Sequence, residues 1–243
     1  MEVFAKSDIG KSRDLNEDSM YIPTPDVGID VYVLADGMGG YQGGNIASSI
    51  AVSAAKSYII NNYEITFDDD QDILSLVNGA IEYANLVVSE RAKEDKRFNQ
   101  MGSTLEVLLI IKDNLYIAHV GDSRIYRVRN RELKKLTTDH SYIQKLINDG
   151  KITKEQSKFH PDKNMITKAI GTELVVEPEL IHHKLQKDDI LLVCSDGLTN
   201  MVSEKEILNT LNDEYDEKIA QRLIDKANAN GGTDNITVII IKI

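Results

Sequence analysis

The stretch LEVLLIIKDNLYIAHVGDSRIYRVRNRELKKL, residues 105–136, decides the fold of this chain. Its apolar runs 105–111 and 115–120 are separated only by Lys-Asp-Asn, which favours a tight antiparallel hairpin. The runs 125–128 and 132–136 flank Arg-Asn-Arg in the same way. We therefore predict an antiparallel meander in the middle of the chain, and not a series of parallel strands joined by helices.

The patterns outside this stretch complete an α+β arrangement. Short apolar, β-branched runs predict further strands at 31–35, 190–194 and 236–241. A 3.6-residue apolar period predicts helices at 44–63, 72–92, 142–148, 203–211 and 217–229. Helices that are grouped apart from antiparallel strands indicate stacked sheets covered by pairs of helices. No Pro-, Gly- or Ser-rich linker divides the chain, so we expect a single domain over residues 1–243.

Composition limits the classes of function. The chain has 28 Lys plus Arg and 39 Asp plus Glu, and its formal net charge of −11 argues against a nucleic-acid partner. Hydrophobic residues make up 42% and charged residues 28%, which is typical of a chain that forms a packed core. The single Cys excludes an intramolecular disulfide. No apolar run approaches membrane-spanning length and no signal peptide is recognisable, so we expect a cytoplasmic protein without membrane insertion, and a monomer by default.

Acidic residues stand beside the ends of predicted strands in several parts of the chain. They are Glu17 and Asp18 in RDLNED, Asp36 in LADGMGG, Asp122 in HVGDSR, Asp196 in CSDGL and Asp234 in GGTDNITV. Carboxylates that are brought together at such positions repel one another unless a cation or hydrogen bonds neutralise them. Oxygen ligands without a cluster of His or Cys favour Mg²⁺ or Mn²⁺ over Zn²⁺. Gly37, which follows Asp36, allows its backbone carbonyl to approach an ion closely.

Each of these signals also has a structural interpretation. A single Asp-Gly after a strand is more often a turn than a metal ligand, and only the repetition of the pattern favours a metal site. The acidic run from Asp68 to Asp72 is typical of a solvated helix start. His119 and Cys194 lie in apolar runs and are expected in the core. Arg13 is either a surface residue or a cation that binds a phosphate.

The segments RDLNED, LADGMGG, GST, HVGDSR, CSDGL and GGTDNITV, in this order, resemble the metal-dependent protein serine/threonine phosphatases of the protein phosphatase 2C family, specifically the short bacterial type. The similarity extends from about Ser7 to Val238. The resemblance implies a four-layer α-β-β-α sandwich, in which two antiparallel sheets are flanked by pairs of helices. It also implies a centre for two Mn²⁺ or Mg²⁺ ions at one end of the sandwich.

The resemblance assigns expected roles to the acidic residues. Asp36 would bridge the two ions, the Gly37 carbonyl would bind the second, and Asp196 and Asp234 would complete the first. Asp18 and Glu17 would act mostly through metal-bound waters. Asp122 would help Asp196 hold a third, weaker ion. Arg13 would receive the substrate phosphate, and residues 141–168 would form a flap beside the site.

The implied activity is hydrolysis of phosphoserine and phosphothreonine by a metal-bridged hydroxide, with phosphorylated proteins as partners and a bacterial serine/threonine kinase as the opposing enzyme. An alternative is a non-catalytic phosphoprotein-binding module with a structural metal site. A third interpretation, a phosphatase dedicated to a regulator of transcription factors, differs only in substrate. The chain has Met38 where many eukaryotic relatives have a His that is proposed to protonate the leaving group. Because Met cannot donate a proton, we expect a metal-bound water in that role.

Overall fold

Two antiparallel β-sheets form the centre of the computed structural model, which describes residues 1–39, 43–64, 69–157, 160–213 and 215–243. The five-stranded sheet contains, in spatial order, β1 (Glu2–Asp8), β11 (Ile236–Lys242), β10 (Ile190–Cys194), β7 (Arg124–Arg129) and β8 (Glu132–Lys135). The other sheet contains β2 (Asp18–Tyr21), β3 (Asp30–Met38), β5 (Leu105–Ile111), β6 (Asn114–Val120) and β9 (Glu179–Lys184), with β4 (Gly102–Ser103) paired to β3. The predicted hairpins are the pairs β5–β6 and β7–β8.

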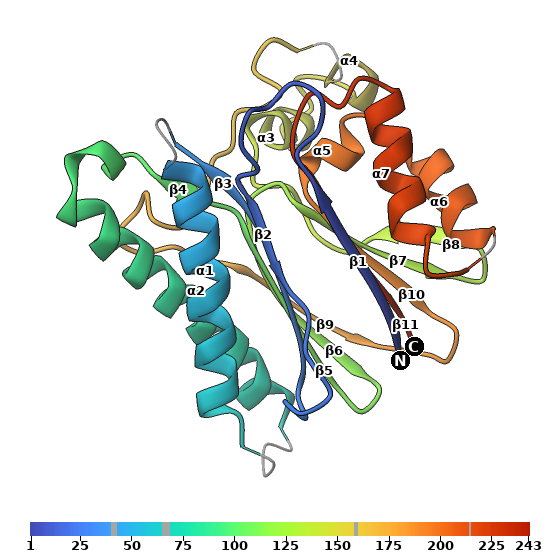
Figure 1. Cartoon of the computed structure of the whole chain (residues 1–243), viewed down its shortest axis with the longest axis horizontal. Coiled ribbons are helices and arrows are strands. Elements are labelled where there is room, and N and C mark those ends of the chain that lie inside the picture. The colour runs from blue at the N-terminus through green and yellow to red at the C-terminus, as the bar shows by residue number, and fades with distance from the viewer. Residues whose placement is uncertain (40–42, 65–68, 158–159, 214) are drawn as a thin grey trace.

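Helices cover the outer face of each sheet. The long helices α1 (Gly43–Asn62) and α2 (Asp70–Glu94) lie against the sheet of β2 and β3, whereas α6 (Glu204–Asn212) and α7 (Ile219–Ala229) lie against the other sheet, as Figure 1 shows. The short helix α5 (Asp196–Thr199) follows β10 directly. Three apolar clusters separate the layers: one between the sheets and one beneath each helix pair. The four-layer α-β-β-α sandwich expected from the sequence is confirmed.

Strand β3 shows why the sequence produces these layers. Successive side chains of a strand point to opposite faces. Val31, Val33 and Ala35 pack beneath α1 and α2. Tyr32 and Leu34 belong to the cluster between the two sheets. A strand that is buried on both faces therefore reads as a continuous apolar run, which is how it was recognised in the sequence.

Three of the four edge strands in the described part of the chain, β1, β2 and β9, were not predicted. The apolar run in β1 and β9 is short and is followed by polar residues, Lys-Ser-Asp in β1 and His-His-Lys in β9. His182 and His183 therefore lie within a strand. The first and last strands, β1 and β11, are neighbours, so the termini lie side by side (Figure 1).

The acidic start predicted for the second long helix agrees with the structure where it is described. Asp69 caps α2, and Asp70 and Asp72 lie in its first turn, whereas Asp68 lies outside the described residues. The predicted flap contains α3 (Tyr142–Asn148) and α4 (Lys154–Ser157), and its residues 158–159 are not described. A 3₁₀ turn, η1 (Lys96–Phe98), follows α2. Among the described helices, none combines the length and the apolar character needed to cross a bilayer.

Candidate metal centre

Asp36 lies at the middle of the candidate centre, near the end of β3. Its backbone is held by the GST segment: the Thr104 N–H and the Ser103 Oγ both donate to the Asp36 carbonyl at 2.9 Å, and the Asp36 N–H donates to Thr104 Oγ1 at 2.9 Å. Asp18, the first residue of β2, is paired directly opposite Asp36. Neighbouring antiparallel strands therefore bring two carboxylates of distant sequence together.

Asp196 and Asp234 come from two loops that touch. A Cβ atom on Gly197 would lie 2.0 Å from the Asn235 carbonyl oxygen and 3.4 Å from the Asp234 Cβ, so only glycine allows this approach. Asn200 Nδ2 donates to Asp196 Oδ2 at 2.9 Å across the turn of α5. The loop before β11 and the start of α5 are thereby fixed against each other at the end of the paired strands β10 and β11.

Burial and mutual repulsion mark these carboxylates as one electrostatic unit. The pKa of Asp36 is raised well above its usual range, first by burial and then by the charges of four other aspartates: Asp18, Asp196, Asp122 and Asp234. Burial raises the pKa of Asp18 to about 7, although the hydroxyls of Thr237 and Ser195 offset part of the shift. The pKa of Asp122 is raised to about 7 by burial and by Asp196. The structure thus brings together aspartates from positions 18 to 234.

The donor atoms suit a hard cation. Asp18 Oδ2 accepts a hydrogen bond from Ser195 Oγ at 2.8 Å, whereas Asp18 Oδ1 is buried without a hydrogen-bond partner among the described residues. A Cβ on Gly44 would lie 2.8 Å from the Gly37 carbonyl oxygen and 2.4 Å from Glu17 Oε1, so only glycine fits beside these two oxygens. The Glu17 carboxylate accepts hydrogen bonds from the backbone of Gly44 and Asn45. The unpartnered Asp18 Oδ1, within a group of oxygen donors, matches the preferences of Mg²⁺ and Mn²⁺.

Arg13 lies at the rim of the centre. Its Nη2 contacts Asp234 Oδ2 at 2.9 Å, and its side chain is 46% exposed. Burial opposes the charged state of Arg13, but Asp234, Glu17 and Asp36 outweigh it and raise the pKa of the guanidinium. A guanidinium that is exposed and held beside the carboxylates is placed to bind an incoming anion.

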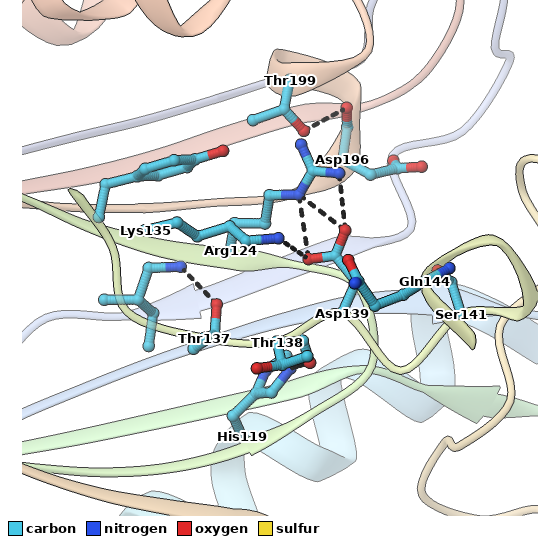
Figure 2. Close-up of polar contacts among 12 residues, drawn as sticks. His119, Arg124, Lys135, Thr137, Thr138, Asp139, Ser141, Gln144, Asp196 and Thr199 are labelled. Carbon is cyan, nitrogen blue, oxygen red and sulfur yellow. Dashed lines mark hydrogen bonds and ion pairs between the residues drawn. The ribbon is translucent and has the colours of Figure 1, made fainter. Parts of the chain in front are cut away.

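Sequence reasoning missed Arg124, a half-buried cation beside these carboxylates. Figure 2 shows its guanidinium between Asp139 and the turn that begins at Asp196. The guanidinium donates to the Asp139 carboxylate through two of its nitrogens. Nε lies 3.1 and 3.0 Å from the two carboxylate oxygens, and Nη2 lies 2.7 Å from Oδ2. Arg124 lowers the pKa of Asp122 and of Asp196 against the larger effect of burial. The signal was present in HVGDSR, where this cation follows Asp122 by two residues.

A second group of possible ligands, His119, His140 and Glu179, has ligand atoms within 4.8 Å of one another. His119 Nδ1 lies 2.7 Å from Glu106 Oε1, and its Nε2 lies 3.0 Å from the Thr138 carbonyl. Burial opposes protonation of His119, but Glu106 outweighs it and raises its pKa. Both ring nitrogens of His119 already lie within hydrogen-bond distance of an oxygen, so neither is free to bind a metal. We interpret His119, His140 and Glu179 as a polar group that stabilises the fold, in which His119 lies in the core as expected.

Cys194 is fully buried in β10, and burial raises its pKa to about 12. It is therefore an inert core residue, as the sequence indicated.

Comparison with known proteins identifies the family. The family model for Protein phosphatase 2C matches residues 11–230. The chain belongs to the protein phosphatase 2C family. It is 37% identical to protein phosphatase PhpP of Streptococcus pneumoniae, with 99% of this chain and 97% of PhpP covered. The family resemblance read from the sequence motifs is confirmed, and with it the assignment of this chain as a protein phosphatase.

Solved structures of 2C-type phosphatases share the fold. The serine/threonine phosphatase of S. agalactiae superposes with a TM-score of 0.91 at 40% identity, covering 100% of this chain and 99% of that one. The catalytic domain of serine/threonine protein phosphatase PstP, solved in complex with two manganese ions, gives a TM-score of 0.86 at 32% identity, with 98% and 96% covered. The carboxylate cluster of the present chain therefore lies within a fold that holds manganese in a relative.

Proposed function

We propose that this 2C-type phosphatase hydrolyses phosphoserine and phosphothreonine in proteins by direct attack of water, with two Mn²⁺ or Mg²⁺ ions as cofactors. The observation that carries the proposal is the convergence of Asp18, Asp36, Asp196 and Asp234. Burial raises the pKa of the first three aspartates, and the charge of Asp234 raises each of these pKa values further. A buried group of carboxylates without enough protein cations calls for metal ions.

The residues divide into ligands and phosphate-binding groups. Asp36, the Gly37 carbonyl, Asp196 and Asp234 would hold the two ions, with Asp18 and Glu17 supporting them and Asp122 contributing to a third, weaker site. When bound, such ions lower the pKa of a shared water, orient it and neutralise the charge of the phosphate.

The chain's own groups act on the substrate and on the ligands. Arg13, which is exposed at the rim, binds the phosphate oxygens and so offsets the repulsion between a phosphate dianion and an acidic protein. Thr104 and Ser103 fix the backbone of Asp36, and Ser195 fixes one oxygen of Asp18, so that the ligands are held before substrate arrives. Met38 cannot donate a proton, so the leaving oxygen must take its proton from solvent held in the site.

Hydrolysis of an aryl phosphate and of a phosphothreonine peptide by the purified chain with Mn²⁺ tests this function. Asp36→Asn should lower kcat by about a hundredfold or more, because removing even an outer partner of a metal ligand costs about 10–100-fold. An unchanged kcat in Asp36→Asn would contradict the proposal. The alternative, a phosphoprotein-binding module with a structural metal, predicts phosphopeptide binding without turnover at saturating Mn²⁺.

We further propose that the protein works as a cytoplasmic monomer that opposes a serine/threonine kinase, and that residues 141–168 form a flap over the substrate. The serine/threonine phosphatases among the relatives support the pairing with such a kinase. Size-exclusion chromatography with light scattering tests the monomer. Comparing phosphoproteins in cells with and without the phosphatase tests the kinase pairing, since sites of one kinase should accumulate together.

A further inference from the structure

Strand β2 forms the outer edge of its sheet and begins at Asp18, in the candidate metal centre. Its hydrogen-bonding register follows from one contact: the Gly37 N–H donates to the Glu17 carbonyl at 3.1 Å. In an antiparallel pair, hydrogen-bonded and non-hydrogen-bonded residues alternate. Ser19 and Tyr21 therefore exchange hydrogen bonds with β3, whereas Asp18 and Met20 do not.

Two contacts support this register. The Asp18 N–H donates to the side chain of Asn16 at 3.1 Å and not to β3. The backbone N–H and carbonyl of Asp36, opposite Asp18, are both used by residues 103–104 on the other side of β3. The N–H and carbonyl of Met20 consequently point away from the sheet, and in the described part of the chain no hydrogen bond satisfies them. Unpaired edge groups of this kind are a template for another strand.

A groove of about 260 Å³ runs beside this edge, between β2 and α1. Its wall on α1 consists of Ser49, Val52, Ser53 and Lys56, and its residues on the strand are Ser19, Met20 and Tyr21. Ser19 faces α1, because its Oγ lies 3.0 Å from Ser48 Oγ. Tyr21 points to the same side, and the Lys56 ammonium lies 4.9 Å from its ring centroid. The groove thus extends from Ser19, the residue after Asp18, to the Lys56 ammonium beside the ring of Tyr21.

We propose that the polypeptide of the phosphorylated substrate docks as an extended strand antiparallel to β2, with an acidic side chain beside Lys56. The inference rests on the proposed function and adds the sequence and conformation that the substrate must have. Strand β2 begins at Asp18, which is paired with Asp36, and the next residue, Ser19, lines the groove. A chain that follows this edge therefore reaches the candidate centre, which identifies the occupant as substrate. Lys56, the cation in the lining of the groove, selects the charge. Alternate side chains of an added strand would enter the groove, since they share the face of Ser19 and Tyr21.

The register predicts a position for the acidic residue. A strand rises about 3.4 Å per residue, so Tyr21 lies about 10 Å along β2 from Asp18. A peptide antiparallel to β2 runs from Tyr21 towards Asp18. The acidic residue should therefore precede the phosphorylated residue by about three or four positions.

Phosphothreonine peptides that carry Glu or Lys three or four positions before, or the same distance after, the phosphothreonine test this geometry. For the parent chain, Glu before the phosphothreonine should lower KM by about threefold or more relative to Lys, because the gain is that of a partly exposed ion pair. Lys56→Glu should reverse this preference. The matched control Lys205→Glu, which makes the same change on the exposed surface of α6, should retain it.

Backbone pairing is tested separately by N-methylating the peptide at one residue at a time. Methylation of groups that bond to Met20 should raise KM, and methylation of the intervening groups should not, so the effect alternates with a period of two. The inference would be overturned if N-methylation had the same effect on KM at every position. It would also be overturned if Lys56→Glu kept the preference for Glu over Lys, or if KM depended only on residues after the phosphothreonine. Loss of a dimer in Lys56→Glu would overturn it as well, by showing that a second copy occupies the edge.

The aryl phosphate separates the two levels of the proposal. It has no peptide backbone, so Lys56→Glu should hydrolyse it with unchanged kcat and KM, which also shows that the variant folds. If the parent chain with Mn²⁺ hydrolysed neither substrate, the proposed function itself would fail. If it hydrolysed both but ignored the peptide sequence and N-methylation, only the docking inference would fail.

Discussion

The guanidinium of Arg13 contacts the carboxylate of Asp234 at 2.9 Å, although 221 residues separate them in the sequence. The contact places a cation at the rim of a cluster of aspartates, at a point where both partners remain partly exposed. An exposed pair of this kind contributes little to stability. We therefore propose that the contact serves to position the cation for the substrate phosphate.

Arg13→Ala should raise KM for an aryl phosphate by about tenfold or more and change kcat less, because hydrogen bonds to charged groups contribute about 1.5–3 kcal/mol. Arg13→Lys should restore only part of the affinity, since Lys lacks the planar fork of donors. Steady-state kinetics at saturating Mn²⁺ give both constants. Arg97→Ala, which removes an exposed cation paired with Asp95 elsewhere, serves as control. An unchanged KM in Arg13→Ala would contradict the phosphate-binding role.

The stability of the metal-free protein should fall as pH rises from about 4 to 7. The pKa values of Asp18 and Asp122 are raised to about 7 in the folded chain, so between these pH values the folded state binds more protons than the unfolded state. Each kcal/mol lost should lower Tm by about 2–4 °C. Calorimetry in a chelator at pH 5 and pH 7.5 measures the change.

Mn²⁺ should reverse this trend, because a divalent cation stabilises the ionised carboxylates. The increase in Tm on adding Mn²⁺ should be larger at pH 7.5 than at pH 5, where protons compete for the same oxygens. Equal increases at both pH values would show that these aspartates do not bind the metal.

Gly197→Ala should unfold or strongly destabilise the chain, by about 3 kcal/mol or more, since its Cβ would lie 2.0 Å from the backbone oxygen of Asn235. Any relaxation must separate Asp196 from Asp234, so Mn²⁺ affinity should fall as well. Denaturant unfolding and calorimetric titration measure the two effects. Gly28→Ala is the control: its Cβ meets nothing within 4 Å, and with φ at +68° it should cost only about 1–2 kcal/mol.

Arg124→Gln should destabilise the protein by about 3–5 kcal/mol, because it leaves the buried carboxylate of Asp139 with a single cationic partner, Lys135. Lys135→Gln keeps the contact of Arg124 with both oxygens of Asp139, so it should lower the free energy of unfolding by only about 1 kcal/mol or less. Urea unfolding of the two variants compares them directly. Equal losses would show that the fork geometry of Arg124 has no special role.

Met38→Ala should retain the acidic limb of the pH–rate profile, since Met38 has no proton to donate. The measurement is kcat against pH with an aryl phosphate at saturating Mn²⁺. Loss of that limb in the variant would argue that the environment of Met38, and not solvent in the site, controls protonation of the leaving group.

The interior strands were predictable because burial on both faces leaves an unbroken apolar run, as in β3 and β11. The edge strands β1 and β9 were not, because each has only a short apolar run next to several polar residues, such as His182 and His183, and no local rule distinguishes such a segment from a loop. The aspartates were recognised from their position beside strand ends. Arg124 was not, because its importance depends on Asp139, which arrives from a separate segment.

The sequence by itself determined the layered α+β fold, the family and the residue types at the centre, because hydrophobic periodicity and short motifs are local properties of the chain. Only the tertiary structure decided that Asp18 pairs with Asp36, that the Asp234 loop touches Gly197, and that Met20 leaves an open edge beside Lys56. These relationships depend on strand register and close backbone contact between distant segments. Packing of the whole chain determines these contacts, so no local sequence pattern can predict them.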